Sequence, residues 1–240
     1  MSNIEKNLQT VKDRISRVCE RTSRPVDSVK LVAVSKKMPA SSIRKAFDCG
    51  QFSFGENYAQ EFRDKNNELC DLCIDWHFIG HLQKNKVKYV APKAKMIETI
   101  DSLKIAEVIN AKATDKIDCL IEVNIGDESS KAGTDIAEIE NIARGIAALP
   151  NLDLRGLMII PPYEIDPEDS RPHFKKLKEM LELLNERLPL EKPLTELSMG
   201  MSHDFEVAIE EGATIVRVGT AIFGERDSCR SVTAAIAKNV

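Results

Sequence analysis

The feature that most constrains this chain is a regular alternation of short apolar segments with amphipathic ones. Apolar and β-branched runs of strand length recur eight times, and segments with apolar residues at three- and four-residue spacing separate them. The expected strands span residues 31–36, 52–54, 75–79, 96–99, 119–124, 154–159, 195–198 and 213–218. The expected helices between them span residues 41–49, 57–69, 83–90, 102–113, 136–149 and 202–211, with a long helix carrying Phe174, Leu177, Leu181, Leu184 and Leu188.

Eight such units predict an α/β fold, a single (β/α)8 barrel of the TIM type. The 240 residues of the chain suit that fold, since such barrels typically have about 250 residues. An extra helix is expected in front of the first strand, and we expect one domain over residues 1–240. An open doubly wound sheet is the alternative, but it usually carries a glycine-rich loop after its first strand. Lys36-Lys37-Met38-Pro39 stands at that place and favours the barrel.

Composition narrows the possible partners. The net charge is −4 and only 5% of the residues are aromatic, which argues against a nucleic-acid surface. No apolar run approaches the roughly 18 residues of a membrane span, and the charged N-terminus has no signal-peptide core, so we expect a cytoplasmic protein. Cys70 and Cys73 have metal-like spacing, but no second pair accompanies them, so we expect free thiols and no metal site.

Lys36 is the first residue that a structural role does not explain. In a strand over residues 31–36, Val32, Val34 and Lys36 share one face. An ammonium is costly to bury unless it is paired or neutralised, and a lysine that loses its charge easily is a nucleophile toward carbonyls. The alternative is that Lys36 ends the strand and reaches solvent.

Two glycine-containing segments follow the last two expected strands. In a barrel, the loops after strands seven and eight usually bind phosphate, and here they contain residues 198–202 and 219–224. Glycine lets backbone N–H groups approach an anion, and the hydroxyls of Ser202 and Thr220 add donors. Ser202 is expected to cap the following helix, whereas Asp204 in its first turn would repel an anion. The alternative is that both segments are ordinary turns.

Arg217 strengthens the case for a ligand pocket. It alternates with Val216 and Val218, which suit packing against outer helices, so we expect Arg217 to point into the barrel. A buried guanidinium needs partners. Glu122 is one candidate, and a ring nitrogen or phosphate of a ligand is another. An amine, a phosphate-binding loop and an inward arginine together describe a pocket for a phosphorylated aldehyde, of which pyridoxal 5'-phosphate (PLP) is the commonest in proteins.

Long segments of the chain resemble the pyridoxal phosphate homeostasis proteins, the YggS/PROSC family. The matching segments are LVAVSK (31–36), FGENYAQE (54–61), WHFIGHLQKNK (76–86), RGLM (155–158), LSMGMS (197–202) and VRVGTAIFGER (216–226). The resemblance implies a fold-type III barrel related to the N-terminal domain of alanine racemase, with an internal aldimine on Lys36. It also implies phosphate contacts from Ser202, Gly219 and Thr220, Arg217 at the pyridine nitrogen, and a pocket lined by Asn57, His77 and Met158. His81 replaces a proline of some relatives, which affects only that loop.

The interpretation that we favour is a PLP carrier or buffer with no catalytic residues. Arg217 cannot give the ring nitrogen a proton, although the racemases that the chain resembles share this arrangement. Only residues 225–240 follow the last glycine loop, so the second domain that supplies a catalytic tyrosine in alanine racemase is expected to be absent. An amino-acid racemase or decarboxylase is the alternative, and a cofactor-free Schiff-base aldolase is a third. We expect a monomer whose partners are PLP and apo-enzymes that need it.

Overall fold

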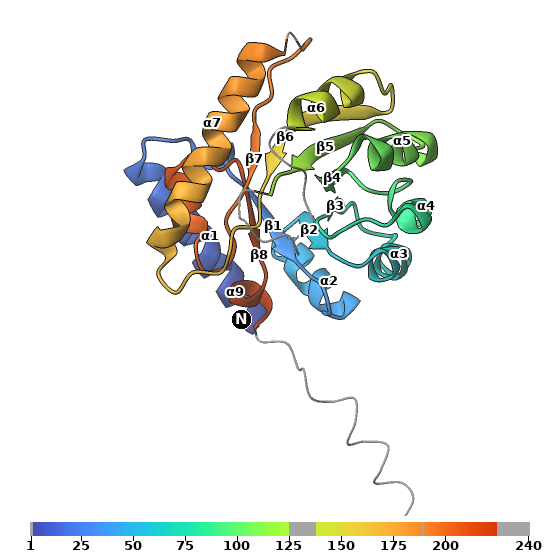
Figure 1. The fold of residues 1–240 in the computed structure, drawn as a ribbon. Helices are drawn as coiled ribbons and strands as arrows, with labels where there is room; N and C mark the ends of the chain where they lie inside the picture. The colour runs from blue at the N-terminus through green and yellow to red at the C-terminus, as the bar shows by residue number, and fades with distance from the viewer. Residues whose placement is uncertain (1, 125–137, 189, 225–240) are drawn as a thin grey trace, which may run out of the picture.

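The fold is a closed barrel of eight parallel strands surrounded by helices, as Figure 1 shows. The computed structural model describes residues 2–124, 138–188 and 190–224. The strands follow one another around the barrel in chain order, so every neighbouring pair is parallel, and β8 pairs with β1. They are β1 (Lys30–Val34), β2 (Ser53–Glu56), β3 (Asp75–Phe78), β4 (Met96–Ile100), β5 (Ile117–Glu122), β6 (Leu152–Met158), β7 (Glu196–Ser198) and β8 (Ile215–Val218). The predicted (β/α)8 barrel is therefore confirmed, and the open sheet is excluded.

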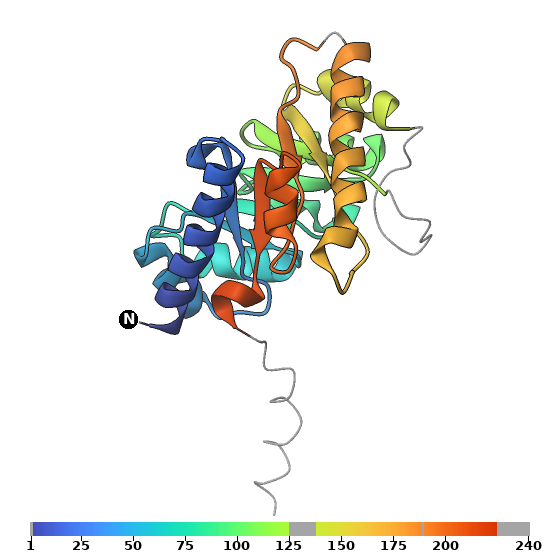
Figure 2. The same ribbon diagram turned by 90° about the vertical axis from the view of Figure 1, so that its left-hand side faces the viewer.

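Helices cover the outside of the barrel. They are α1 (Asn3–Arg21), α2 (Ala40–Asp48), α3 (Ala59–Glu68), α4 (Val87–Val90), α5 (Leu103–Lys112), α6 (Ile139–Ala147), α7 (Arg171–Arg187), α8 (Phe205–Glu210) and α9 (Thr220–Phe223), with 3-10 turns at Val26–Ser28, Lys84–Lys86 and Pro167–Ser170. The expected extra helix is α1, which starts at a capping box between Ser2 and Glu5 and lies against α8 and α9 (Figure 2). Within the described parts of the chain, none of these helices is long and apolar enough to cross a membrane.

Alternate side chains of each strand enter two different layers. The outward side chains pack against the helices in one large apolar core, which includes Phe54, Phe78 and Ile97. The inward side chains form a much smaller apolar cluster of Val32, Met96, Leu120, Met158 and Ile215. The inward positions His77, Glu98, Ser198 and Arg217 are polar and buried. Polar groups inside the barrel are thus concentrated near the ends of strands, where barrel enzymes and binding proteins hold their ligands.

Two segment boundaries differ from expectation in ways that affect the site. β1 ends at Val34 rather than at Lys36, because a turn closed by a hydrogen bond from Met38 N to Ser35 O (3.0 Å) follows it. α8 begins at Phe205, so Ser202 is not its cap as predicted; Asp204 is the N-cap residue. The first part of the helix expected over residues 136–149 lies outside the described residues, and α6 starts at Ile139.

Candidate functional site

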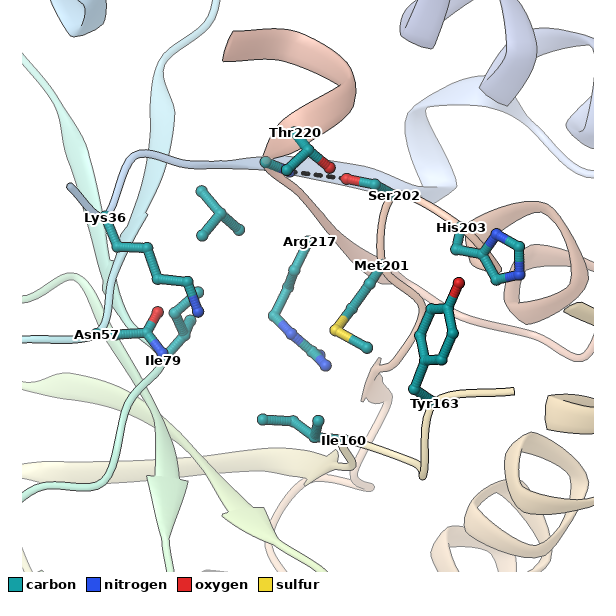
Figure 3. Close-up of a pocket in the computed structure, with 12 residues that line it drawn as sticks. Lys36, Asn57, Ile79, Ile160, Tyr163, Met201, Ser202, His203, Arg217 and Thr220 are labelled. Carbon is teal, nitrogen blue, oxygen red and sulfur yellow. Dashed lines mark hydrogen bonds between the residues drawn. The ribbon is translucent and has the colours of Figure 1, made fainter. Parts of the chain in front are cut away.

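A pocket opens at the C-terminal ends of the strands. Its volume is about 290 Å³, near the lower end of the roughly 300–1,000 Å³ typical of small-molecule sites. It is lined by Val34, Lys36, Asn57, Ile79, Ile160, Tyr163, Met201, Ser202, His203, Arg217, Gly219 and Thr220 (Figure 3). Six of the eight predicted site residues therefore lie together here, although they come from four distant segments of the chain. None of the described lining residues is acidic, so the pocket favours an anionic ligand.

Lys36 enters this pocket and its neighbour Lys37 does not. Lys36 lies two residues beyond β1, on the side of Val34, and its side chain points into the same space as Arg217 (Figure 3). Lys37 is exposed and has a left-handed backbone conformation, with φ of 62°. The alternation expected for a strand therefore persists through the turn and separates the two lysines.

The loops after β7 and β8 meet on the other side of the pocket. The backbone N–H of Gly219 donates a hydrogen bond to Ser202 Oγ (3.1 Å), and Thr220 follows with its side chain exposed (Figure 3). Gly200 has φ of 90°, and a Cβ there would lie only 2.6 Å from Ala208 Cβ, so glycine is required for this loop to pack on α8. Asp204 turns away from the pocket, since its Oδ1 accepts a hydrogen bond from Met201 N (2.6 Å). The acidic residue therefore closes the loop and does not face an anion.

Asn57 lies where three hollows of the surface adjoin. Gly80 makes this position possible, because a Cβ at Gly80 would lie 2.2 Å from the Asn57 carbonyl oxygen. Asn57 Oδ1 is buried and has no hydrogen-bond partner among the described residues. An unpartnered buried polar atom is costly, and a bound ligand would satisfy it.

Arg217 lies at the floor of the pocket and is 4% exposed. It donates hydrogen bonds to Ser198 Oγ (2.6 Å) and to the Ile159 carbonyl oxygen (2.8 Å). Burial lowers the pKa of its guanidinium, and the charges of Glu98, Glu122 and Asp204 oppose this shift. The sequence analysis named Glu122 as a candidate partner of Arg217. Within the described residues, the hydrogen bonds of Arg217 go to Ser198 and Ile159 instead.

Glu98 completes the buried network instead. Its Oε2 accepts a hydrogen bond from Ser198 Oγ (2.5 Å), and its Oε1 lies 2.6 Å from His77 Nδ1. Burial by itself would raise the pKa of Glu98, but the hydrogen bond and charge of His77, the charge of Arg217 and the Ser198 hydroxyl lower it below its usual range. Sequence reasoning missed Glu98, although a charged residue inside the apolar run Met96–Ile100 was the signal that could have found it.

Two predicted pocket residues, His77 and Met158, are not among the lining residues. His77 is fully buried beside Glu98, and its Nε2 has no partner among the described residues. Met158 belongs to the inner apolar cluster. Both are fully buried, and neither is among the residues that line the described pocket. That they contact a ligand stays a prediction.

A second hollow of about 240 Å³ adjoins the pocket and shares Asn57, Ile79 and Ile160 with it. Glu122 lines this hollow, is 5% exposed, and its Oε2 has no partner among the described residues. Burial raises the pKa of Glu122 to about 7, with Arg217 lowering it and Asp101 raising it. A group that titrates near neutral pH therefore lies beside the Lys36 pocket.

Comparison with known proteins gives concordant matches. Residues 4–227 match the family described as "Alanine racemase, N-terminal domain". The pyridoxal phosphate homeostasis protein of Aquifex aeolicus is 46% identical over 227 residues, covering 93% of this chain and 99% of that protein. That of Escherichia coli K12 is 42% identical over 233 residues, covering 95% and 98%.

A solved structure agrees with these matches. PipY of Synechococcus elongatus PCC7942, in a structure with PLP bound, superposes with a TM-score of 0.80 at 35% identity, covering 92% of this chain and all of that one. Sequence and fold thus match the same group of proteins over nearly the whole chain. The chain belongs to the pyridoxal phosphate homeostasis protein family, whose barrel is that of the alanine racemase N-terminal domain.

Proposed function

We propose that this protein binds PLP through Lys36 and acts in PLP homeostasis as a carrier or buffer. The observation that carries the proposal is the convergence of Lys36, Arg217, Ser202 and Gly219 on one pocket without an acidic lining residue. The names of the relatives and the PLP bound to PipY support the choice of ligand. The residues present also fit it: one amine, donors suited to a phosphate, and an unpartnered amide oxygen on Asn57.

Each residue has a defined part in this proposal. Ser202 Oγ, the Gly219 N–H and Thr220 Oγ1 would bind the phosphate. The Gly219 N–H now donates to Ser202 Oγ, so it would exchange that hydrogen bond for one to a phosphate oxygen. Arg217 would face the ring nitrogen and, because it stays charged, would donate a hydrogen bond without transferring a proton. When bound, the cofactor supplies an aldehyde that condenses reversibly with the Lys36 amine.

The surroundings of Lys36 support a role in holding the cofactor rather than in catalysis. Racemisation needs acid–base groups on both faces of the substrate carbon, each within about 3 Å of the proton. Tyr163 is the tyrosine that lines the described pocket, but it is 76% exposed and its ring lies against His203, with 5.5 Å between centroids. An exposed phenol at the rim is not held in the geometry that proton transfer requires. A racemase or decarboxylase that uses Tyr163 is the alternative.

The absorption spectrum of the purified protein, with and without borohydride, tests the binding proposal. We expect a visible band that borohydride removes, with the reduced cofactor found on the peptide that contains Lys36. Lys37→Ala is the matched control and should keep the band. A protein without the band, even after incubation with PLP, would contradict the proposal and leave a cofactor-free aldolase as the better interpretation.

Two incubations distinguish a carrier from an enzyme. A carrier should restore the activity of an apo-enzyme that needs PLP as cofactor leaves Lys36, and it should leave L- and D-alanine unchanged over hours. Steady interconversion of the two enantiomers that is lost in both Lys36→Ala and Tyr163→Phe would establish the racemase alternative. The proposal places the exchange in the cytoplasm, between a monomeric carrier and its recipient enzymes.

A further inference from the structure

A buried lysine lies behind the turn that carries Lys36. Lys65, on α3, is 8% exposed although it is charged. Its Nζ lies 2.7 Å from Glu56 Oε1, 2.9 Å from Glu61 Oε2 and 2.8 Å from the Ser35 carbonyl oxygen. These three acceptors match the three donors of an ammonium group, so the charge is fully satisfied. An arrangement this complete, away from the pocket wall, requires an explanation.

The two carboxylates also hold the residues on either side of Lys36. Glu56 Oε1 accepts a hydrogen bond from Ser35 Oγ (2.6 Å), and Glu61 Oε2 accepts one from the Lys37 backbone N–H (2.8 Å). Lys65 joins the two carboxylates and binds the Ser35 carbonyl directly. We call Glu56, Glu61 and Lys65 the anchor. Both peptide neighbours of Lys36 are therefore tied to α3 and β2.

Lys37 shows what the anchor achieves. Its φ of 62° lies in the left-handed region, which is unfavourable for a residue with a Cβ. Such a conformation persists only where surrounding contacts over-determine it. The hydrogen bond from Lys37 N to Glu61 is one such contact, and the turn from Met38 N to Ser35 O is another. The left-handed residue directs Lys37 to solvent while Lys36 stays directed into the pocket.

Charge states agree with this role. Burial raises the pKa of Glu56, with Lys65 and Ser35 opposing the shift. Burial also acts to raise the pKa of Glu61, but the Lys37 backbone hydrogen bond and Lys65 outweigh it and lower the value. Glu61 is thus ionised at neutral pH, where it attracts Lys65 and accepts from Lys37 at the same time.

We propose that Glu56, Glu61 and Lys65 are positioning residues that select Lys36 over the adjacent Lys37 for attachment of the aldehyde ligand. This inference rests on the proposed PLP binding. The two lysines have the same chemistry and adjoin in sequence, so selection between them must come from backbone geometry. In the attachment step the amine nitrogen forms a bond to the aldehyde carbon and water leaves; borohydride then adds a hydride to that carbon, and the nitrogen takes a proton from solvent.

The test measures which lysine is modified. Wild type, Glu61→Leu and Glu61→Gln are incubated with one equivalent of PLP, reduced with borohydride and mapped by peptide mass spectrometry. Glu61→Leu removes the acceptor for the Lys37 N–H, and we expect the ratio of Lys37 to Lys36 modification to rise roughly tenfold, the effect of losing one hydrogen bond to a charged group. Glu61→Gln keeps an acceptor oxygen, so its ratio should lie between the other two.

A matched control separates positioning from general destabilisation. Arg171 also joins carboxylates, those of Glu168, Glu210 and Glu211, but at the contact of α7 with α8 rather than at the Lys36 turn. Arg171→Met should lower the melting temperature and leave the ratio as in wild type. Lys65→Met should raise the ratio as Glu61→Leu does; if it does not fold, the two Glu61 variants still decide the question.

The possible outcomes are distinguishable. Wild type that is not modified on Lys36 at all would overturn the proposed binding itself. Wild type modified on Lys36, with an unchanged ratio in Glu61→Leu, would overturn the positioning role alone. A ratio that shifts equally in Arg171→Met would show a general effect of stability and would also overturn it.

Discussion

The outward and inward faces of the same eight strands have opposite character. The outward face continues into a large apolar core beneath the helices, whereas the inward face has a small apolar cluster topped by His77, Glu98, Ser198 and Arg217. Alternate residues of one strand thus belong to the outer core or to the barrel interior, since neighbouring side chains point to opposite faces. The comparison teaches that stability is concentrated outside the barrel and ligand chemistry inside it, so substitutions on the two faces should have separable effects.

The largest expected effect is on the inward side. Lys36→Ala should abolish borohydride-fixable cofactor in the pocket, because no other amine lines the described pocket, and should leave the melting temperature nearly unchanged. The cofactor content is measured by absorbance after reduction and gel filtration. Retained covalent cofactor at another pocket residue would break the proposed link between Lys36 and attachment.

The next effect is on the outward side. Phe174→Ala on α7 removes a fully buried ring from the outer core and should lower the free energy of unfolding by about 3–5 kcal/mol. The folded fraction should still bind one cofactor per chain. Leu183→Ala, at an exposed position of the same helix, is the control and should change stability little. Denaturant unfolding measures both, and a loss of binding in folded Phe174→Ala would argue against separable faces.

Two inward glutamates should respond to pH in opposite directions. The pKa of Glu122 in the folded protein, about 7, lies above its ordinary value of 4.5, so the folded state binds more protons between these values and stability falls as pH rises through that window. Glutamine does not ionise, so Glu122→Gln should not lose stability as pH rises through this window. We expect the variant to be more stable than wild type by about 2–3 kcal/mol at pH 8, and this difference in stability should vanish below about pH 5.

Glu98 provides the contrast. Its pKa is lowered in the folded protein, so its ionised form stabilises the fold above its ordinary pKa, and this contribution is lost as pH falls through the folded value. Glu98→Gln should therefore be less stable than wild type at pH 8. Unfolding curves at pH 5 and pH 8 measure both variants. If both substitutions raised the stability at pH 8, or both lowered it, the two carboxylates would not have the opposite pKa shifts described for them.

The smallest effect concerns the loops at the pocket rim. Ser202→Ala removes one donor to the phosphate and should weaken PLP binding by about 1.5 kcal/mol, roughly tenfold in the dissociation constant. The position of the visible band should not change, since Lys36 is untouched. Fluorescence titration of the apo-protein measures the affinity. Unchanged affinity in Ser202→Ala combined with Thr220→Ala would place the phosphate on other groups.

Local sequence pattern was sufficient for the barrel and for much of the pocket. Strand periodicity put Lys36 on one face with Val32 and Val34 and predicted that Arg217 points into the barrel. The loops that usually bind phosphate in this fold pointed to Ser202, Gly219 and Thr220. Periodicity states which side of a strand a residue faces, but it does not state how deep in the barrel that residue lies. His77 and Met158 are therefore fully buried inside the barrel and yet do not line the described pocket.

Contacts between distant segments were decided only by the tertiary structure. Glu98 and Ser198 are 100 residues apart and share a hydrogen bond, and Lys65 on α3 reaches Ser35, which is 30 residues away in the chain. The charge state of Glu122 likewise depends on burial and on Arg217, from another strand. Periodicity reflects the geometry of one segment of backbone, whereas hydrogen bonds and pKa values depend on atoms that only the closed barrel brings within a few ångströms.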